Sequence, residues 1–163
     1  MKNSVKIGVV GVGHLGFHHA KHLSDIGEAN LIGVFDADKT KANEVARQLN
    51  IKAFDSLNSL LDEVDAMSIV TPTSTHVDVA QICIENKCHV FIEKPIATTV
   101  EEADSIIQLA KKHNSIVQVG HIERFNPAFI AAKKQLSEPM LSLIHISEPT
   151  RQEAISYAVF CLK

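Results

Sequence analysis

Apolar residues fall along the chain in two alternating patterns, short continuous runs and longer segments in which they recur every three or four positions. Short apolar runs are typical of strands buried on both faces of a parallel sheet, and the longer spacing is typical of amphipathic helices. The predicted strands span residues 5–11, 30–35, 52–54, 66–70, 89–92 and 116–119. The predicted helices span residues 14–26, 39–49, 74–85, about 100–113 and 128–136.

The order of these elements predicts the topology of the sheet. Strands that alternate with helices pair in parallel through right-handed crossovers, because an antiparallel hairpin needs a linker of only about two to five residues. We therefore expect an α/β fold with an open, doubly wound parallel sheet. In such a sheet, ligands bind beyond the carboxyl ends of the strands, near the point where the strand order reverses.

The composition narrows the class of protein further. The chain has 163 residues, 45% of them hydrophobic and 21% charged, which fits about one domain with a buried core. A formal net charge of −3 argues against a nucleic-acid partner, and no apolar run approaches the ~18 residues of a membrane span. The first residues lead directly into a strand, without room for a secretory signal, and three cysteines do not suggest a disulfide scaffold. We expect a cytoplasmic protein with neither nucleic acid nor a membrane as its partner.

Residues 141–163 follow a different pattern. The first eleven of them, LSLIHISEPTR, resemble the translation of a transposon-based sequencing adapter, and residues 155–163 resemble a second stretch of the same adapter. We therefore expect the natural sequence to be cut near Met140, and we assign no role to Tyr157 or Cys161. The alternative is a natural amphipathic tail.

The first strand ends in a glycine motif, Gly11-Val12-Gly13-His14-Leu15-Gly16, which has the pattern G-x-G-x-x-G. Gly11 permits a tight turn, Gly13 lets a pyrophosphate approach the backbone, and Gly16 lets the helix pack closely on the strand. The N–H groups at the start of the following helix then face the phosphates. Because the motif follows a predicted strand and opens a predicted helix, it favours a dinucleotide site.

Asp36 ends the second strand, about twenty residues after the glycine motif. A carboxylate at this position accepts hydrogen bonds from the adenosine ribose and repels a 2′-phosphate, which favours NAD over NADP. Lys39 and Lys41 weaken that preference, because either could reach a phosphate. The alternative for Asp36 is a turn or helix-capping aspartate.

The fourth and fifth strands also end in polar residues. Thr71-Pro72-Thr73-Ser74-Thr75-His76 follows the fourth strand, and its hydroxyls can cap the next helix or contact a cofactor. Glu93-Lys94-Pro95 follows the fifth strand, where Pro95 restricts Lys94 to an extended backbone. A lysine at this edge can hold a sugar hydroxyl or assist proton transfer, and the alternative is an ordinary surface lysine.

Together, the glycine motif, Thr71-Pro72 with His76, and Glu93-Lys94-Pro95 resemble the glucose-fructose oxidoreductase, inositol dehydrogenase and rhizopine-catabolism family of dehydrogenases. The resemblance runs from about residue 5 to residue 128. It implies a Rossmann-type domain that binds NAD or NADP, followed by a second α/β domain that completes the substrate site. It also implies that Lys94 is a catalytic residue beside the nicotinamide, with a cis peptide before Pro95. The candidate cofactor-binding residues are Gly11, Gly13, His14, Leu15, Gly16, Asp36, Thr71, His76, Glu93 and Lys94.

Residues 120–127, Gly-His-Ile-Glu-Arg-Phe-Asn-Pro, resemble a narrower branch of this family, the UDP-N-acetylglucosamine 3-dehydrogenase-like members. The resemblance predicts a sugar or nucleotide-sugar substrate. We expect Arg124 to pair with a diphosphate and His121 to face the sugar, with Asn126 and Lys94 as further substrate-binding residues. The alternative is that Arg124 pairs with Glu123 or another acid.

The histidines of the first predicted helix and two of the cysteines suggest structural roles. Three histidines lie four positions apart on the first predicted helix, a spacing that can bind a metal: His14, His18 and His22. Because His14 belongs to the glycine motif, we expect no metal. His19 falls on the apolar stripe of the same helix and predicts a packed, hydrogen-bonded side chain. Cys83 and Cys88 predict buried packing rather than redox chemistry.

The expected organisation is an NAD(P)-binding domain over residues 1–122, the start of a truncated substrate domain over residues 123–140, and the adapter-like residues 141–163. The expected reaction of the parent protein is hydride transfer between a sugar hydroxyl carbon and nicotinamide. The resemblance places the principal base, a histidine, in the second domain, so we expect this chain to turn over little or no substrate. It also implies a homo-oligomeric parent.

Two other functions stay open at this point. One is a polyol or inositol dehydrogenase, against which residues 121–127 argue. The other is a non-catalytic nucleotide-sensing module on the same fold. A sensor needs only the phosphate-binding loop, so Lys94 within Glu-Lys-Pro favours the enzyme.

Overall fold

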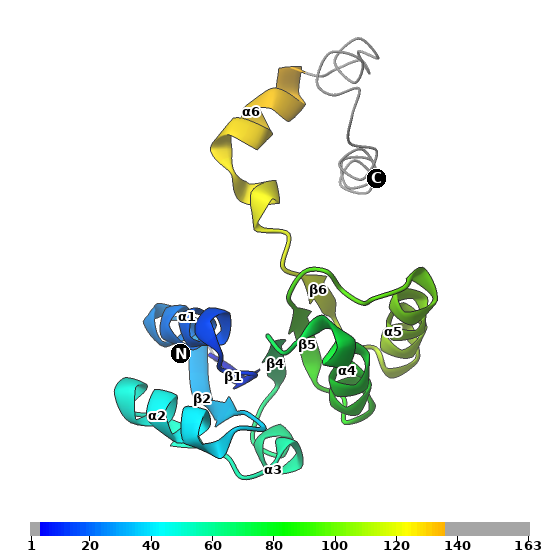
Figure 1. Ribbon diagram of the computed structural model, residues 1–163. Coiled ribbons are helices and arrows are strands. Elements are labelled where there is room, and N and C mark those ends of the chain that lie inside the picture. The colour runs from blue at the N-terminus through cyan, green and yellow to red at the C-terminus, as the bar shows by residue number, and fades with distance from the viewer. Residues whose placement is uncertain (1–3, 136–163) are drawn as a thin grey trace. The chain divides into compact units, whose positions relative to one another are not determined.

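The computed structural model describes residues 4–135 of the chain. Its centre is a six-stranded sheet in which all neighbouring strands are parallel, in the order β3-β2-β1-β4-β5-β6 (Figure 1). The strands are β1 (Val5–Val10), β2 (Ala29–Phe35), β3 (Lys52–Ala53), β4 (Ala66–Ile69), β5 (His89–Ile92) and β6 (Val117–Val119). Because the order steps outward from β1 on one side and from β4 on the other, the predicted doubly wound α/β sheet is confirmed.

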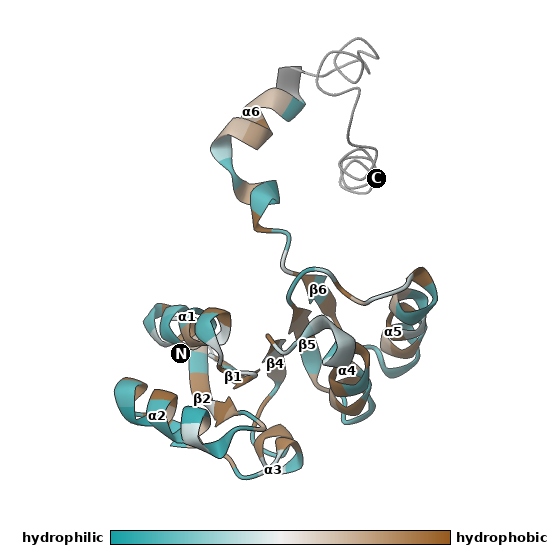
Figure 2. Ribbon diagram, viewed as in Figure 1, coloured by the Kyte–Doolittle hydropathy of each residue, from teal (hydrophilic) through white to brown (hydrophobic). Residues whose placement is uncertain are grey.

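Helices cover both faces of the sheet. They are α1 (His14–Asp25), α2 (Lys39–Leu49), α3 (Leu57–Leu61), α4 (His76–Glu85) and α5 (Val100–His113). Val9 packs in an apolar cluster with residues of α1 and α2, whereas the adjacent Val10 packs in a second cluster with residues of α3, α4 and α5. Since successive side chains of a strand point to opposite faces, α1 and α2 cover one face and α3 to α5 cover the other. In Figure 2 the strands are largely apolar, whereas α2 is largely polar.

The helix ends follow from local sequence chemistry. Thr99 and Glu102 form a capping box at the start of α5, each side chain accepting the backbone N–H of the other. The Asp38 carboxylate accepts two backbone N–H groups in the first turn of α2. Asn50 and Asn114 end α2 and α5 with φ values of 54° and 56°, in the left-handed region that asparagine tolerates. These residues explain why the predicted bounds of both helices lie close to the observed ones.

Two short elements that precede α4 were not predicted, nor was the later 3₁₀ helix η2 (Ile122–Phe125). Helix α3 spans five residues, too few to show an apolar repeat, although Leu60 and Leu61 are buried and Ser56 caps its first turn. A 3₁₀ helix, η1 (Thr73–Thr75), precedes α4, so the segment predicted as one helix over residues 74–85 begins as a 3₁₀ turn.

The chain folds as two units, the first of which ends at His121. The second begins at Ile122 with the 3₁₀ helix η2 (Ile122–Phe125) and α6 (Pro127–Gln135). The predicted adapter-like residues 141–163, with Tyr157 and Cys161, lie outside the described residues, as does the predicted cut near Met140. Among residues 4–135, no helix is both long enough and apolar enough to cross a membrane.

Candidate functional site

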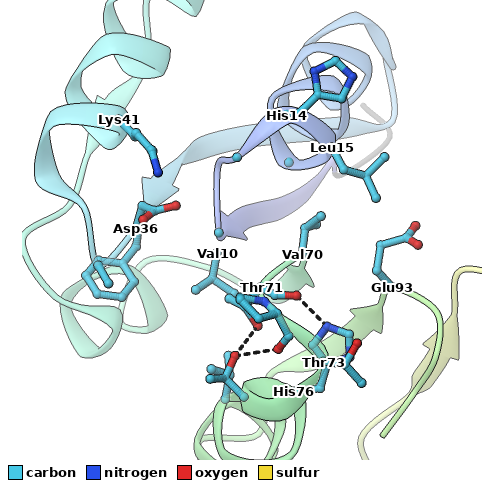
Figure 3. Close-up of a pocket in the computed structure, with 18 of the residues that line it drawn as sticks. Val10, His14, Leu15, Asp36, Lys41, Val70, Thr71, Thr73, His76 and Glu93 are labelled. Atoms are coloured by element: carbon cyan, nitrogen blue, oxygen red, sulfur yellow. Dashed lines mark hydrogen bonds between the residues drawn. The ribbon is translucent and has the colours of Figure 1, made fainter. Parts of the chain in front are cut away.

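A cleft of about 790 Å³ runs along the edge of the sheet where β1, β2, β4 and β5 end (Figure 3). All of the candidate cofactor-binding residues line it: Gly11, Gly13, His14, Leu15, Gly16, Asp36, Thr71, His76, Glu93 and Lys94. The cleft therefore includes the point between β1 and β4 where the strand order reverses, as the sequence predicted.

The three glycines of the motif play different parts in the geometry. Gly11 has a φ of +82°, and a Cβ atom there would lie 2.7 Å from the Val70 carbonyl oxygen. A Cβ atom on Gly16 would collide with the Gly11 carbonyl oxygen, so α1 packs on the turn only without a side chain at this position. A Cβ atom on Gly13, by contrast, would have no neighbour within 4 Å. Gly11 and Gly16 are required by the fold, whereas Gly13 leaves open space at the amino end of α1.

Asp36 connects the glycine motif to the end of β2. Its Oδ2 accepts the Val12 N–H at 2.7 Å, and its Oδ1 accepts the Asp38 N–H at 2.8 Å. Each carboxylate oxygen has a second lone pair, so Asp36 can still accept hydrogen bonds from hydroxyls in the cleft. The sequence predicted the place of Asp36 from its spacing to the glycines but not its bond to the turn.

Both lysines beside Asp36 are paired with other carboxylates. Lys39 Nζ lies 3.0 Å from Asp55 Oδ1, and Lys41 Nζ lies 3.6 Å from Asp38 Oδ2. Hydrogen bonds from backbone N–H groups, that of Lys41 first, lower the pKa of Asp38. Lys41 lines the cleft and points toward Asp36 (Figure 3). Of the two lysines, Lys41 is the one that a phosphate in this part of the cleft would meet, because Lys39 does not line the cleft. The exposed ion pair between Lys41 and Asp38 is weak, at about 1 kcal/mol or less, and so does little to prevent such a contact.

His76 joins the loops that follow β4 and β5. Its side chain is almost fully buried, and Nε2 lies 2.9 Å from the Thr71 carbonyl oxygen (Figure 3). The other ring nitrogen, Nδ1, lies 3.0 Å from the Pro95 carbonyl oxygen. A neutral imidazole has one N–H and donates to one of these oxygens, whereas the doubly protonated ring donates to both. Both ring nitrogens thus face the protein, and no local sequence pattern predicts these long-range contacts.

The two carboxylate oxygens of Glu93 hold the Glu-Lys-Pro segment through contacts with different residues. The Lys94–Pro95 peptide is cis, as the family resemblance implied. Glu93 is 8% exposed, its Oε2 accepts the Lys94 N–H at 3.0 Å, and its Oε1 lies 3.2 Å from His19 Nε2. His19 Nδ1 lies 3.0 Å from Ser68 Oγ, so the predicted packed, hydrogen-bonded histidine is confirmed. Burial lowers the pKa of His19, and the Glu93 charge opposes that shift.

The candidate substrate-binding residues divide between the two units. Lys94 lines the cleft, and His121 follows β6 at the same edge of the sheet, with its N–H donating to the Val119 carbonyl at 2.8 Å. Arg124 and Asn126 belong to the second unit, so their place beside the cleft stays a prediction. The Asn126 side chain accepts the backbone N–H of Ala128 and donates to the Glu123 carboxylate, contacts that start α6.

The three histidines spaced along α1 contact one another, and the cysteines Cys83 and Cys88 are buried. The rings of His14 and His18 meet edge to face at 4.9 Å, and those of His18 and His22 stack at 6.5 Å. Within residues 4–135, no three His, Cys, Asp or Glu side chains gather as metal ligands. Cys83 and Cys88 are buried as predicted, and burial raises the pKa of both thiols, that of Cys88 to about 12. Such thiols are poor nucleophiles.

Comparison with known families identifies the fold and the cleft. Residues 5–121 match the family described as "Oxidoreductase family, NAD-binding Rossmann fold" (GFO_IDH_MocA). The chain belongs to this family. The match covers the whole sheet and the cleft, and it confirms the predicted family and its NAD cofactor.

Individual relatives are substantially longer than the chain. The UDP-N-acetylglucosamine 3-dehydrogenase of Acidithiobacillus ferrooxidans is 47% identical over 124 residues, which make up 76% of this chain and 39% of the relative. The scyllo-inositol 2-dehydrogenase (NAD(+)) of Bacillus subtilis is 39% identical over 140 residues, 83% of this chain and 41% of the relative. A solved structure of an Acidithiobacillus ferrooxidans UDP-N-acetylglucosamine 3-dehydrogenase has a TM-score of 0.78 at 44% identity, covering 81% of this chain and 43% of that chain. The chain thus spans about two fifths of these relatives.

The cleft residues fit the NAD cofactor of the family. The open space at Gly13 lies at the amino end of α1, where N–H groups and the helix dipole favour a pyrophosphate. Asp36 keeps acceptor positions for ribose hydroxyls, and Val10 and Val70 give the cleft an apolar wall.

Proposed function

We propose that the cleft binds NAD with the adenosine ribose at Asp36, the pyrophosphate at Gly13 and the nicotinamide beside Lys94. The observation that supports this is that a single cleft is lined by all three residues. Asp36 follows β2 and Lys94 follows β5, and the glycine motif follows β1, which lies between those strands in the sheet. A dinucleotide presents its ribose, pyrophosphate and nicotinamide in the same order. His14, Leu15, Gly16, Thr71, His76 and Glu93 form the remaining walls.

We infer that the parent protein transfers a hydride between a hydroxyl-bearing carbon of a sugar and nicotinamide. NAD, when bound, supplies the hydride acceptor of that reaction. Lys94 holds the substrate hydroxyl at the nicotinamide end and assists the movement of its proton. Glu93 accepts the Lys94 N–H and so fixes the backbone that carries this side chain. The principal base belongs to the second domain of the parent.

The substrate that we favour is a nucleotide sugar such as UDP-N-acetylglucosamine. Arg124 carries a planar guanidinium that suits a diphosphate, and His121 and Asn126 carry groups that hydrogen-bond sugar hydroxyls. The relative at 47% identity carries the name of a dehydrogenase for this substrate. The second candidate is a cyclic polyol, which is supported by the scyllo-inositol 2-dehydrogenase relative over a longer aligned stretch.

The parent protein is, on this proposal, a cytoplasmic homo-oligomer whose partner is a small molecule rather than nucleic acid or a membrane. The slightly acidic charge of −3 supports the exclusion of nucleic acid. Sedimentation of the protein produced from the full gene measures its oligomeric state.

The experiment that tests the function has two parts. Calorimetry on this chain measures the binding of NAD⁺ and NADP⁺. Enzyme assays on the product of the full gene then follow NAD⁺ reduction with UDP-N-acetylglucosamine and with scyllo-inositol, before and after Arg124→Ala. Loss of activity on the nucleotide sugar alone after Arg124→Ala supports the first substrate class. A protein that binds NAD⁺ but reduces it with neither compound would instead support the nucleotide-sensing module.

A further inference from the structure

A chain of polar contacts extends from Lys94 to residues outside the cleft. The Lys94 N–H donates to Glu93 Oε2 at 3.0 Å, and the other Glu93 oxygen lies 3.2 Å from His19 Nε2. The second ring nitrogen of His19 lies 3.0 Å from Ser68 Oγ. His19 and Ser68 line a separate hollow on the α1 face of the sheet and not the NAD cleft.

The donors and acceptors of this chain match in one arrangement. A carboxylate only accepts hydrogen bonds, so His19 Nε2 donates to Glu93. In a neutral ring the other nitrogen, Nδ1, is then an acceptor for the Ser68 hydroxyl. Burial lowers the pKa of His19, which favours the neutral ring. Each polar group thus has a partner, and the Glu93 carboxylate has one favoured orientation.

Gly120 confines the Glu93 carboxylate from a different element. A Cβ atom on Gly120 would lie 2.7 Å from Glu93 Oε1 and 3.2 Å from the Phe91 ring. The space beside Gly120 is therefore already filled by the carboxylate. His19 on α1 and Gly120 after β6 together determine where the buried carboxylate lies.

We propose that His19 is a positioning residue that, through the Glu93 carboxylate, fixes the backbone of Lys94 and so its side chain at the nicotinamide end of the cleft. The proposal rests on the NAD-binding mode given above. It assigns no contact between His19 and the cofactor. It predicts that a change at His19 affects the Lys94 end of the cleft and leaves the Asp36 end unchanged.

The test compares NADH with ADP-ribose, which lacks the nicotinamide. For this chain, His19→Ala is expected to weaken NADH binding about tenfold and ADP-ribose binding less than about twofold, because only the Lys94 end is disturbed. His19→Gln keeps an N–H donor toward Glu93 and is expected to retain most of the NADH affinity. His22→Asn, an exposed histidine on the same helix, is the matched control and is expected to change neither affinity.

A second variant perturbs the same carboxylate without touching His19. Gly120→Ala displaces Glu93 from the β6 side and is expected to produce the same selective loss of NADH affinity. Hydrogen exchange of the Lys94 amide provides a readout without any ligand, and it is expected to be faster in His19→Ala and in Gly120→Ala than in His22→Asn or the wild type.

The outcomes separate this proposal from the function on which it rests. Equal weakening of both ligands in His19→Ala, or unchanged Lys94 exchange in both His19→Ala and Gly120→Ala, contradicts the positioning role while the NAD cleft stands. A wild-type chain that binds neither NADH nor ADP-ribose overturns the NAD cleft itself.

Discussion

The Val12 N–H donates a 2.7 Å hydrogen bond to Oδ2 of Asp36, so the acid at the end of β2 holds the turn that follows β1. Asp36 also accepts the N–H of Asp38, the residue that caps α2. A single carboxylate therefore supports the glycine motif and faces the part of the cleft assigned to the adenosine ribose. Changes at Asp36 should alter both the stability of the fold and the choice of cofactor.

Asp36→Asn is expected to shift the preference between NADH and NADPH toward NADPH by about tenfold or more, because the charge that repels a 2′-phosphate is lost. The free energy of unfolding should fall by about 1–3 kcal/mol, because asparagine has one acceptor oxygen where Asp36 uses two, for the N–H groups of Val12 and Asp38. Fluorescence titration and urea unfolding measure the two effects. Asp55→Asn, which removes the partner of Lys39 outside the cleft, is the control. An unchanged cofactor preference in Asp36→Asn contradicts the assigned role.

Two glycines of the motif should respond differently to substitution, Gly13 in cofactor binding and Gly16 in the stability of the fold. Gly13→Ala should leave the free energy of unfolding within about 0.5 kcal/mol of the wild type, because its Cβ meets no protein atom. It should weaken NADH binding by about tenfold or more, because the methyl group enters the space assigned to the pyrophosphate. Gly16→Ala should instead destabilise the fold, since its Cβ collides with the Gly11 carbonyl. Equal NADH affinity in Gly13→Ala and the wild type would place the pyrophosphate elsewhere.

Much of the fold could be predicted from the sequence because its main elements are long enough to show a period. The apolar run of β1 and the capping box of α5 are local signals, and both elements were predicted close to their observed bounds. Helix α3 has five residues and no such signal, so it was missed. The positions of Asp36 and Lys94 at one edge followed from the rule that parallel strands present their carboxyl ends together.

The supporting contacts of the site could not be predicted. His76 meets carbonyl oxygens of Thr71 and Pro95, and His19 meets Glu93, a residue on another element far along the chain. The apolar stripe of α1 predicted that His19 is packed and hydrogen-bonded, but a stripe gives no partner. Partners of this kind depend on the packing of α1 against the sheet, which no local pattern specifies.

His76→Leu tests the contacts that join the loops after β4 and β5. The substitution removes the buried imidazole that contacts the carbonyl oxygens of Thr71 and Pro95, and it should lower the free energy of unfolding by about 1–3 kcal/mol. Urea unfolding measures the change, with the exposed His22→Asn as the control, for which we expect a change below about 0.5 kcal/mol. A stable His76→Leu protein would show that the loops after β4 and β5 are held by other contacts.

The lowered pKa of His19 predicts a dependence of stability on pH. The unfolded chain binds the proton more readily than the folded chain, because burial disfavours the charged ring in the fold. The stability that depends on neutral His19 is therefore fully present above the ordinary histidine pKa of 6.5 and is lost as the pH falls toward the lowered folded value. The difference in unfolding free energy between the wild type and His19→Gln should change between about pH 7.5 and 5. A difference that stays constant over this range contradicts the assignment of a neutral ring.

An NMR titration of the isotope-labelled chain with NAD⁺ tests most directly whether one dinucleotide lies along the cleft. With NAD⁺ bound as proposed, the backbone amide signals of Gly13, Asp36 and Lys94 should shift together with one dissociation constant, because one dinucleotide contacts all three. Adenosine monophosphate, which lacks the nicotinamide, should shift the signals at Gly13 and Asp36 and leave that of Lys94 in place. Shifts confined to residues outside the cleft, or a Lys94 signal that does not respond to saturating NAD⁺, would contradict this binding mode.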